Sequence, residues 1–414
     1  MRILLIHQYY LEEDDPGGSR FNEMTKNWSD LGHEITVLAG TIHYNLNSKR
    51  QEYKGKLYLK KKQGIIDVYR CFVSENYNKN FLFRLFGYFS FVLSSSIVGL
   101  FKTKNKFDVI LVTSPPLFVG LTALIISFFK RIPYVFEVRD LWPESAIDTG
   151  VLTNKLLIKL SYWLERKIYN KASLINVVTP AFRNTLILHK GIQEKKIIYI
   201  PNAADFSISD ELLSSFDVAQ FRQQHNIQDK FVITYVGAHG VANHLIQLID
   251  VAERLIDTNV LFLLIGEGME KKMLKEEVVK RNLNNIKFID AVPKQEVFKY
   301  ILASDLGVSV LKKVETFKTV FSNKTFDYMA CKKPILMLID GVSRDLVEKA
   351  NCGLYAEPEN INEIVNKVKI YLENSSLLNK QGLNGYLYAK DNFDRSVLSN
   401  KYLDELIKMV EIHE

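Results

Sequence analysis

The chain has 414 residues, of which 47% are hydrophobic and 24% are charged, and its net charge is +7. This composition is globular and excludes a disordered or low-complexity chain, while the length predicts two domains, because a single core seldom grows beyond roughly 250–300 residues. Three scattered cysteines without metal-ligand spacing predict reduced, buried thiols in a cytoplasmic protein. We expect no nucleic-acid partner.

The first predicted element is a strand near Arg2–Ile6, whose apolar run is far too short for a secretory signal. A glycine-containing loop follows it and opens a helix that runs to Leu31. Backbone N–H groups of such a loop can bind a diphosphate or an acceptor, so we assign Gly17, Gly18 and Arg20 to this role. A flexible loop before a capped helix is the alternative.

Two groups of basic residues, within 49–62 and 102–106, flank an apolar segment from Phe81 to Phe101. The segment is about as long as the roughly 20 residues that span a bilayer, but Arg84, serines and glycines interrupt it. We expect a helix lying on the inner leaflet, with the lysines of residues 49–106 on anionic headgroups. The protein would then be peripheral to the inner face of the plasma membrane. A buried domain helix and a transmembrane helix are the alternatives.

Apolar strands alternate with helical patterns along the chain, which predicts two doubly wound parallel sheets. In the first half, further strands are expected near residues 34–38, 65–71, 109–112, 134–138, 174–178 and 197–200. In the second half, strands are expected near residues 231–236, 260–265, 286–289, 306–310 and 335–338. We therefore predict an α/β protein with two Rossmann-like domains, residues 1–200 and 201–391, that face a ligand-binding cleft, and a helix over 392–414 that crosses back to the first domain.

A charged motif from Phe136 to Ser145 begins where a strand of the first domain ends. It places two carboxylates beside a tryptophan, and partial burial at such a position can tune carboxylate pKa values. We assign Asp140 and Glu144 to catalysis and Arg139 to the diphosphate or acceptor. An ion pair between Arg139 and a helix-capping Asp140 is the alternative.

Two glycine loops follow strands of the second domain. Gly237, His239 and Gly240 come after the first of these strands, and Gly266 and Gly268 come after the next. We assign all five to nucleotide binding, although a tight strand-to-helix turn explains the second loop equally well. The first strand is not followed by G-x-G-x-x-G with an acidic residue about 20 positions on, so a hydride-transfer enzyme is disfavoured.

A short polar turn opens a predicted helix at Ser322. The helix N-terminus and Lys324 would meet negative phosphate, and Asp327, one turn later, can accept hydrogen bonds from ribose hydroxyls. We assign Lys324 and Asp327 to catalysis, and Ser322 and Asn323 to donor binding; the family resemblance described next adds Thr319 to the donor-binding residues.

Together these motifs resemble family 4 of the retaining glycosyltransferases, which have the GT-B fold, over nearly the whole chain. Within that family the chain resembles bacterial O-antigen and capsule enzymes described as L-fucosamine (N-acetyl-L-fucosaminyl) transferases. The segments that carry the resemblance are residues 17–18, 113–116, 137–144, 201–205, 237–240, 266–268 and 322–334.

The resemblance implies retaining transfer of a sugar from a UDP-sugar to a polyprenyl-diphosphate-linked saccharide. It also implies that no metal or other cofactor is needed, because basic residues and helix N-termini neutralise the leaving diphosphate. The chain departs from the family at Ala238 and Asn243, where relatives carry an arginine and a lysine that hold the diphosphate. His239 or Arg344 is our candidate for the lost contacts.

A second departure concerns the paired glutamates of the family, because Asp327 stands at the second position and Thr319 at the first. A shorter carboxylate can still reach ribose, but the donor sugar must be held differently. Two rival functions therefore remain: a nucleotide-sugar 2-epimerase of the same architecture, and a non-catalytic scaffold that binds nucleotide or lipid.

Overall fold

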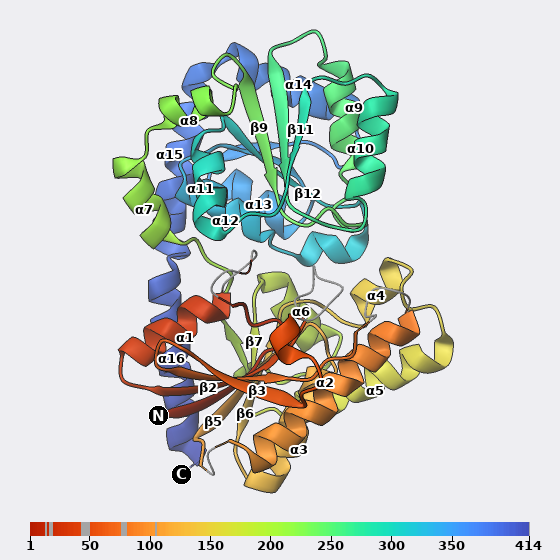
Figure 1. The fold of residues 1–414 in the computed structure, drawn as a ribbon, viewed down its shortest axis with the longest axis vertical. Coiled ribbons are helices and arrows are strands. Elements are labelled where there is room, and N and C mark those ends of the chain that lie inside the picture. Colours follow the sequence, from red (N-terminus) through yellow and green to blue (C-terminus); the bar gives the residue numbers. More distant parts are fainter. Residues whose placement is uncertain (13–14, 16–19, 43–49, 76–80, 104–105, 414) are drawn as a thin grey trace. The chain divides into compact units, whose positions relative to one another are not determined.

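The computed structural model describes residues 1–12, 15, 20–42, 50–75, 81–103 and 106–413 (Figure 1). These residues form two compact units. The first contains the described residues up to Pro201 and those from Ser396 onward, and the second spans Asn202–Arg395. Each unit is built around a mainly parallel sheet with helices on its faces, which confirms the predicted pair of Rossmann-like domains.

The first unit contains an eight-stranded sheet in the order β3-β4-β2-β1-β5-β6-β7-β8, in which only the β3–β4 pair is antiparallel. Its strands are β1 (Arg2–Ile6), β2 (Glu34–Gly40), β3 (Tyr58–Gln63), β4 (Ile66–Cys71), β5 (Val109–Thr113), β6 (Tyr134–Val138), β7 (Leu174–Val177) and β8 (Ile197–Tyr199). Its helices are α1 (Arg20–Asp30), α2 (Phe81–Phe101), α3 (Val119–Lys130), α4 (Glu144–Asp148), α5 (Lys155–Lys171), α6 (Pro180–Leu188) and α16 (Arg395–His413). The central strands are buried on both faces and read as continuous apolar runs, as parallel strands between helices do.

The basic stretch before β4 forms the edge strand β3, which the sequence pattern did not predict. Lys60 and Lys62 lie 3.0 Å and 3.7 Å from the Asp67 carboxylate, and Lys61 lies 3.0 Å from Glu12. Lysines on an edge strand discourage pairing with another chain. The membrane surface that we expect over residues 49–106 stays a prediction for this strand, whose lysines form ion pairs within the first unit.

Helix α2 has one buried and one exposed side. Phe91 and Val98 are fully buried, and Ser95 Oγ lies 2.9 Å from Thr122 Oγ1 on α3, so the helix is a packed part of the domain. Its other side carries large apolar side chains at helical spacing, with exposed fractions of 42% to 74%. These exposed residues are Phe83, Phe86, Phe89, Leu93 and Phe101. Among the described residues, no helix combines the length and apolar character needed to cross a membrane.

Helix α16 packs against α1 within the first unit. Trp28 Nε1 donates to the Ser399 carbonyl at 2.9 Å, and Asn27 Nδ2 donates to Ser399 Oγ at 3.0 Å. The Trp28 ring also meets Tyr402 edge to face, with 5.9 Å between the centroids. These contacts fix where the last helix docks, which its apolar spacing alone does not specify.

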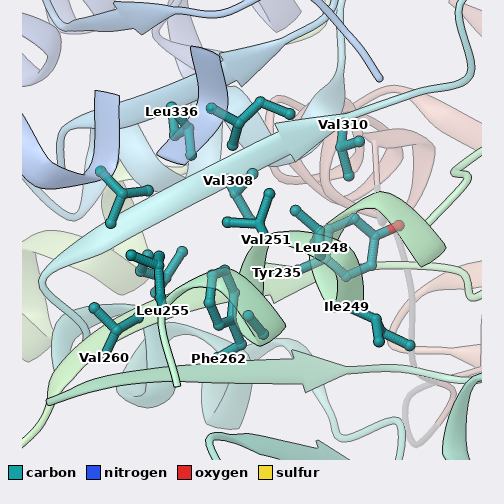
Figure 2. Close-up of a cluster of buried hydrophobic side chains, with 14 of the residues drawn as sticks. Tyr235, Leu248, Ile249, Val251, Leu255, Val260, Phe262, Val308, Val310 and Leu336 are labelled. Atoms are coloured by element: carbon teal, nitrogen blue, oxygen red, sulfur yellow. The ribbon is translucent and has the colours of Figure 1, made fainter. Parts of the chain in front are cut away.

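The second unit contains a six-stranded parallel sheet in the order β11-β10-β9-β12-β13-β14. Its strands are β9 (Phe231–Val236), β10 (Val260–Ile265), β11 (Ile286–Ile289), β12 (Leu306–Val310), β13 (Ile335–Leu338) and β14 (Gly353–Tyr355). Its helices are α7 (Phe206–Ser215), α8 (Val218–Gln224), α9 (Ile246–Arg254), α10 (Lys271–Lys280), α11 (Lys294–Leu302), α12 (Asn323–Ala330), α13 (Val342–Lys349), α14 (Ile361–Glu373) and α15 (Ser375–Asn392). Figure 2 shows one core cluster, in which Leu248 and Val251 of α9 pack on Tyr235, Phe262 and Val308 of the sheet.

Candidate functional site

The second sheet reverses its strand order between β9 and β12. These two strands pair only at Leu306 with Ile233 and at Gly307 with Thr234, so their last residues are not paired with each other. Ligands of open α/β sheets bind outside the carboxyl ends of the strands at such a point. Two of the predicted donor-binding segments, the loop after β9 and the N-terminus of α12, adjoin this point.

Tyr328 fixes α12 to the diverging strands. Its hydroxyl lies 2.9 Å from the Thr234 carbonyl and 3.2 Å from the Val308 carbonyl, and it accepts from Val236 N–H at 3.2 Å. The ring crosses Gly307, where an added Cβ would lie 2.4 Å from a ring atom. A glycine in β12 therefore lets the helix approach the sheet.

We expect Gly307→Ala to lower the free energy of unfolding by about 1–3 kcal/mol, the usual cost of overpacking a dense core. Gly240→Ala is the matched control, because its added Cβ would meet only Asn243 Oδ1, at 3.9 Å. Thermal unfolding of both variants measures the difference. An equal melting temperature for the two would contradict this view of how α12 is held.

The Lys324 side chain runs from α12 toward the end of β9. Its Nζ lies 4.8 Å from the centre of the Tyr235 ring and 3.4 Å from Ser322 Oγ. Its Cε lies 3.3 Å from the position that a Cβ on Gly237 would take. Burial lowers the pKa of Lys324 to about 8, against the opposing effect of the Asp327 carboxylate. Lys324 and Ser322, predicted from one motif, are thus brought together with Gly237, predicted from another.

The remaining donor-side residues surround this group. Ser322 precedes α12 without a capping hydrogen bond from its side chain. Asn323 is exposed and Asp327 is half-buried. Thr319 is half-buried, and its hydroxyl donates to the Thr316 carbonyl at 2.6 Å.

The two glycine loops of the second unit pack on each other. Gly237 N–H donates to the Ile265 carbonyl at 3.0 Å, and His239 N–H donates to the Glu267 carbonyl at 2.8 Å. An added Cβ on Gly266 would lie 1.9 Å from the Gly237 carbonyl oxygen, and one on Gly268 would lie 2.3 Å from that of His239. The backbone of the first loop approaches so closely that only glycine fits at positions 266 and 268, which gives both glycines a structural reason.

The two candidates for the missing positive charge lie in different surroundings. His239 is fully buried, and burial together with the charges of Lys271 and Lys275 lowers its pKa to about 4. Its ring is therefore uncharged near neutral pH. Arg344 donates to Glu348 at 2.8 Å and stacks over the Tyr355 ring at 4.3 Å, beside a surface groove. We withdraw His239 as a source of positive charge, and Arg344, which is half exposed, stays a prediction.

The first unit holds the second group of predicted catalytic residues after β6. Asp140 accepts a hydrogen bond from Ser145 Oγ at 2.7 Å. Burial raises the pKa of Asp140, the Ser145 hydrogen bond opposes this shift, and the Glu144 charge adds to it. Glu144 begins α4 and accepts from Lys190 Nζ at 2.7 Å.

Lys190 links this motif to a buried carboxylate on α5 that sequence reasoning missed. Its Nζ also donates to Glu165 at 2.5 Å. Burial raises the pKa of Glu165 to about 7, against the opposing charge of Lys190. The lysine is therefore the shared counter-ion of two acidic residues, and it holds α4 in place beside Asp140.

Arg20 has a different role from the predicted one. It is buried, donates to Glu137 through Nε and Nη2 at 3.2 Å each, and donates to the carbonyls of Ile200 and Pro201. We correct the assignment of Arg20 as a diphosphate ligand, because its guanidinium neutralises the fully buried Glu137. Arg139 Nε lies 4.0 Å from the same carboxylate.

Two other predictions concern loops and metals. Gly17 and Gly18 lie outside the described residues. Within the part of the chain that the structure describes, no three His, Cys, Asp or Glu side chains are grouped so that they could hold a metal ion.

The two Rossmann-like units have the architecture of GT-B glycosyltransferases. Family comparisons assign both halves. Residues 17–203 match the glycosyl transferase 4-like domain, and residues 217–388 match the glycosyl transferases group 1 family. The chain belongs to this family of glycosyltransferases.

Known proteins similar to the chain fall in the same class. It is 24% identical over 302 residues to the putative colanic acid biosynthesis glycosyl transferase WcaI of Escherichia coli, covering 71% of this chain and 74% of that protein. Anabaena HepE in complex with UDP-glucose has a TM-score of 0.72 and 18% identity, covering 99% and 100% of the two chains. WaaG, a glycosyltransferase involved in lipopolysaccharide biosynthesis, has a TM-score of 0.70 and 15% identity, covering 98% and 99%.

Proposed function

We propose that the protein transfers a sugar from a UDP-sugar to a lipid-linked saccharide and retains the anomeric configuration. The observation that carries this proposal is the position of Lys324, whose ammonium lies beside Gly237 at the carboxyl end of β9. The structures of HepE with UDP and with UDP-glucose support a nucleotide-sugar donor. The naming of WcaI in colanic acid biosynthesis supports a role in polysaccharide assembly.

In this proposal the diphosphate is the leaving group, and its growing negative charge is the feature that the protein must stabilise. Lys324 and the amide groups at the N-terminus of α12 supply that stabilisation, since preorganised donors in a buried site act strongly on developing charge. Asp327 accepts hydrogen bonds from the ribose. No metal is needed, because the ammonium and the amide dipoles take its place.

Asp140 and Glu144 act on the other partner in the reaction, the sugar and its acceptor. A carboxylate with a raised pKa can accept a proton from an acceptor hydroxyl when that hydroxyl attacks. Lys190 and Ser145 hold the two carboxylates in place.

For the sugar we propose N-acetyl-L-fucosamine or a related N-acetylated amino sugar, and for the acceptor a polyprenyl-diphosphate-linked saccharide of an O-antigen or capsule. The test is to offer a panel of UDP-sugars with a lipid-linked acceptor, in the presence of EDTA, and to detect the product by mass spectrometry. We expect one donor to give a product whose mass grows by one sugar residue. A product that forms only when a divalent metal is added would contradict the metal-free part of the proposal.

The same assay separates the two rivals. An epimerase would change the UDP-sugar without any acceptor, and a scaffold would bind the nucleotide or the lipid and leave the UDP-sugar unchanged. Single-sugar transfer that requires the acceptor excludes both.

We further propose that the enzyme works as a peripheral protein at the inner face of the plasma membrane. The exposed aromatic side of α2 and its flanking residues Lys102 and Lys106 suit an anionic lipid surface. Helix α5 lies on the same face of the sheet as α2, with α3 between the two helices, and it has a similar exposed side (Figure 1). That side carries Leu156, Leu160, Trp163, Lys155, Lys159 and Arg166.

We expect the double variant Phe86→Asp, Leu93→Asp to lose binding to vesicles of phosphatidylcholine and phosphatidylglycerol by about tenfold or more, because each side chain gives up about 1.5–3 kcal/mol of apolar burial. Flotation with the vesicles measures the bound fraction of each variant. Val279→Asp is the matched control, since Val279 is exposed and apolar but lies on α10. Equal flotation of the double variant and the wild type would exclude α2 from the membrane surface.

A further inference from the structure

Tyr235 occupies an unusual position at the end of β9. Its ring is fully buried in the core cluster with Leu248 and Val308, as Figure 2 shows. Its hydroxyl nevertheless leaves the core and donates to the carbonyl of Ala238 at 2.8 Å. The side chain therefore ties the strand to the loop that begins at Gly237.

The same ring is the aromatic partner of Lys324. The ammonium nitrogen lies 4.8 Å from the ring centre, within the range of a cation–π interaction. The other groups that act on this ammonium are the Ser322 hydroxyl, at 3.4 Å, and the Asp327 carboxylate on the same helix. Burial favours the neutral amine, so the negative face of the ring helps to keep the charge where it lies.

Gly237 completes the arrangement. A Cβ at this position would lie 3.1 Å from the Tyr235 hydroxyl and 3.3 Å from Lys324 Cε. Both side chains thus converge on one residue of the loop, Tyr235 from the strand and Lys324 from α12. A tyrosine that only filled the core would require neither the hydrogen bond to the loop nor the ammonium on its face.

We infer that Tyr235 is the positioning residue for the diphosphate site, with two separable actions. Its ring holds the Lys324 ammonium in the charged form at the carboxyl end of β9, and its hydroxyl holds the loop of residues 237–240 in the shape that receives the diphosphate. The inference rests on the proposed function, because it names what holds the group that binds the donor. Tyr235 does not touch the substrate in this account and acts through Lys324 and the loop.

The two actions predict different behaviour for two substitutions. Tyr235→Phe keeps the ring and removes the hydroxyl, so we expect UDP affinity to fall by about 3- to 10-fold at every pH, as one hydrogen bond is lost. Tyr235→Leu removes the ring. UDP affinity declines with rising pH, and we expect the midpoint of this decline to lie about one pH unit lower in the leucine variant. In the wild type this decline should begin near pH 8, where Lys324 loses its proton.

Calorimetric titration with UDP between pH 6.5 and 9 measures both effects. If the wild type binds UDP and the leucine variant keeps the wild-type pH midpoint, the inference is wrong, although the proposed function survives. A phenylalanine variant whose midpoint moves as far as that of the leucine variant would also overturn it, because the ring would then not be the cause. Should Tyr235→Leu fail to fold, Tyr235→Met serves instead, since an unbranched chain fills core gaps readily.

A second measurement needs no nucleotide. Competitive acetylation followed by mass spectrometry reports the proton affinity of the Lys324 amine in the free protein, and we expect a lower value in the leucine or methionine variant than in the wild type and the phenylalanine variant. If the wild type bound no UDP at any pH, the proposed function would fail, and this titration would still decide whether the ring stabilises the charged lysine. Equal titration of Lys324 in all variants would refute the inference.

Discussion

Lys324→Ala should lower kcat by about 100-fold or more, the scale seen when one charge-stabilising donor is removed from a buried site. The Lys324 side chain lies beside Gly237 and Ser322, and positions 238 and 243, where the family resemblance implies an arginine and a lysine, hold Ala238 and Asn243. In the proposed site, Lys324 and the first amide groups of α12 therefore neutralise the leaving diphosphate. Steady-state rates with saturating donor and acceptor measure the effect.

Two controls make this result specific to the position of the charge. Lys272→Ala removes an ammonium that is highly exposed on α10, so its rate should equal that of the wild type. Lys324→Arg keeps a charge but changes its shape and reach, so its rate should fall between those of the alanine variant and the wild type. A full rate in Lys324→Ala would move the stabilising role to another residue.

Asp140→Asn should lower the rate of transfer by about 100-fold and leave UDP affinity nearly unchanged, since a positioned acid or base contributes about 10²–10⁴. Asparagine keeps the size of the side chain and can still accept a hydrogen bond from Ser145, so the change removes mainly the charge. Calorimetry with UDP and a transfer assay on the same preparation separate binding from turnover. Equal losses in both would contradict the placement of Asp140 on the sugar and acceptor side.

The pH dependence gives an independent check on Asp140. Burial raises the pKa of Asp140. As the solution is acidified, Asp140 is therefore protonated, and activity is lost, at a higher pH than for an ordinary aspartate. Ser145→Ala removes a hydrogen bond that favours the charged form, and the acid limb of the rate profile should therefore move to higher pH. An acid limb that is the same in wild type and Ser145→Ala would exclude Asp140 as its source.

Most of the fold follows from the pattern of apolar runs. The predicted strands over residues 231–236, 260–265, 286–289, 306–310 and 335–338 agree with β9 to β13 at both ends. The two strands that were missed lie at sheet edges. Strand β3 carries three consecutive lysines, Lys60 to Lys62, and its sequence is typical of a solvated loop, while β14 has only three residues, beginning with Gly353.

The candidate site was harder to predict because its geometry depends on contacts between distant segments. Lys324 could be identified from its place at the start of a helix. Tyr235 and Tyr328 could not, because each is one more buried aromatic until the strands and α12 are in place. The buried, uncharged state of His239 also depends on its neighbours, since its pKa follows from burial and from lysines on α10.

Lys190 and Arg20 show the same difficulty for charged residues. Both carry the right charge to bind phosphate, but the structure places Lys190 between two carboxylates and Arg20 against the buried Glu137. A partner 117 positions away in the chain cannot be read from the sequence around Arg20.

The most direct test is a crystal structure of the protein soaked with UDP. We expect the β-phosphate of UDP to lie within ion-pair distance of Lys324 Nζ and to face the first amide groups of α12, with Asp327 at the ribose. A nucleotide bound elsewhere, or a Lys324 ammonium directed into solvent while UDP is present, would contradict it.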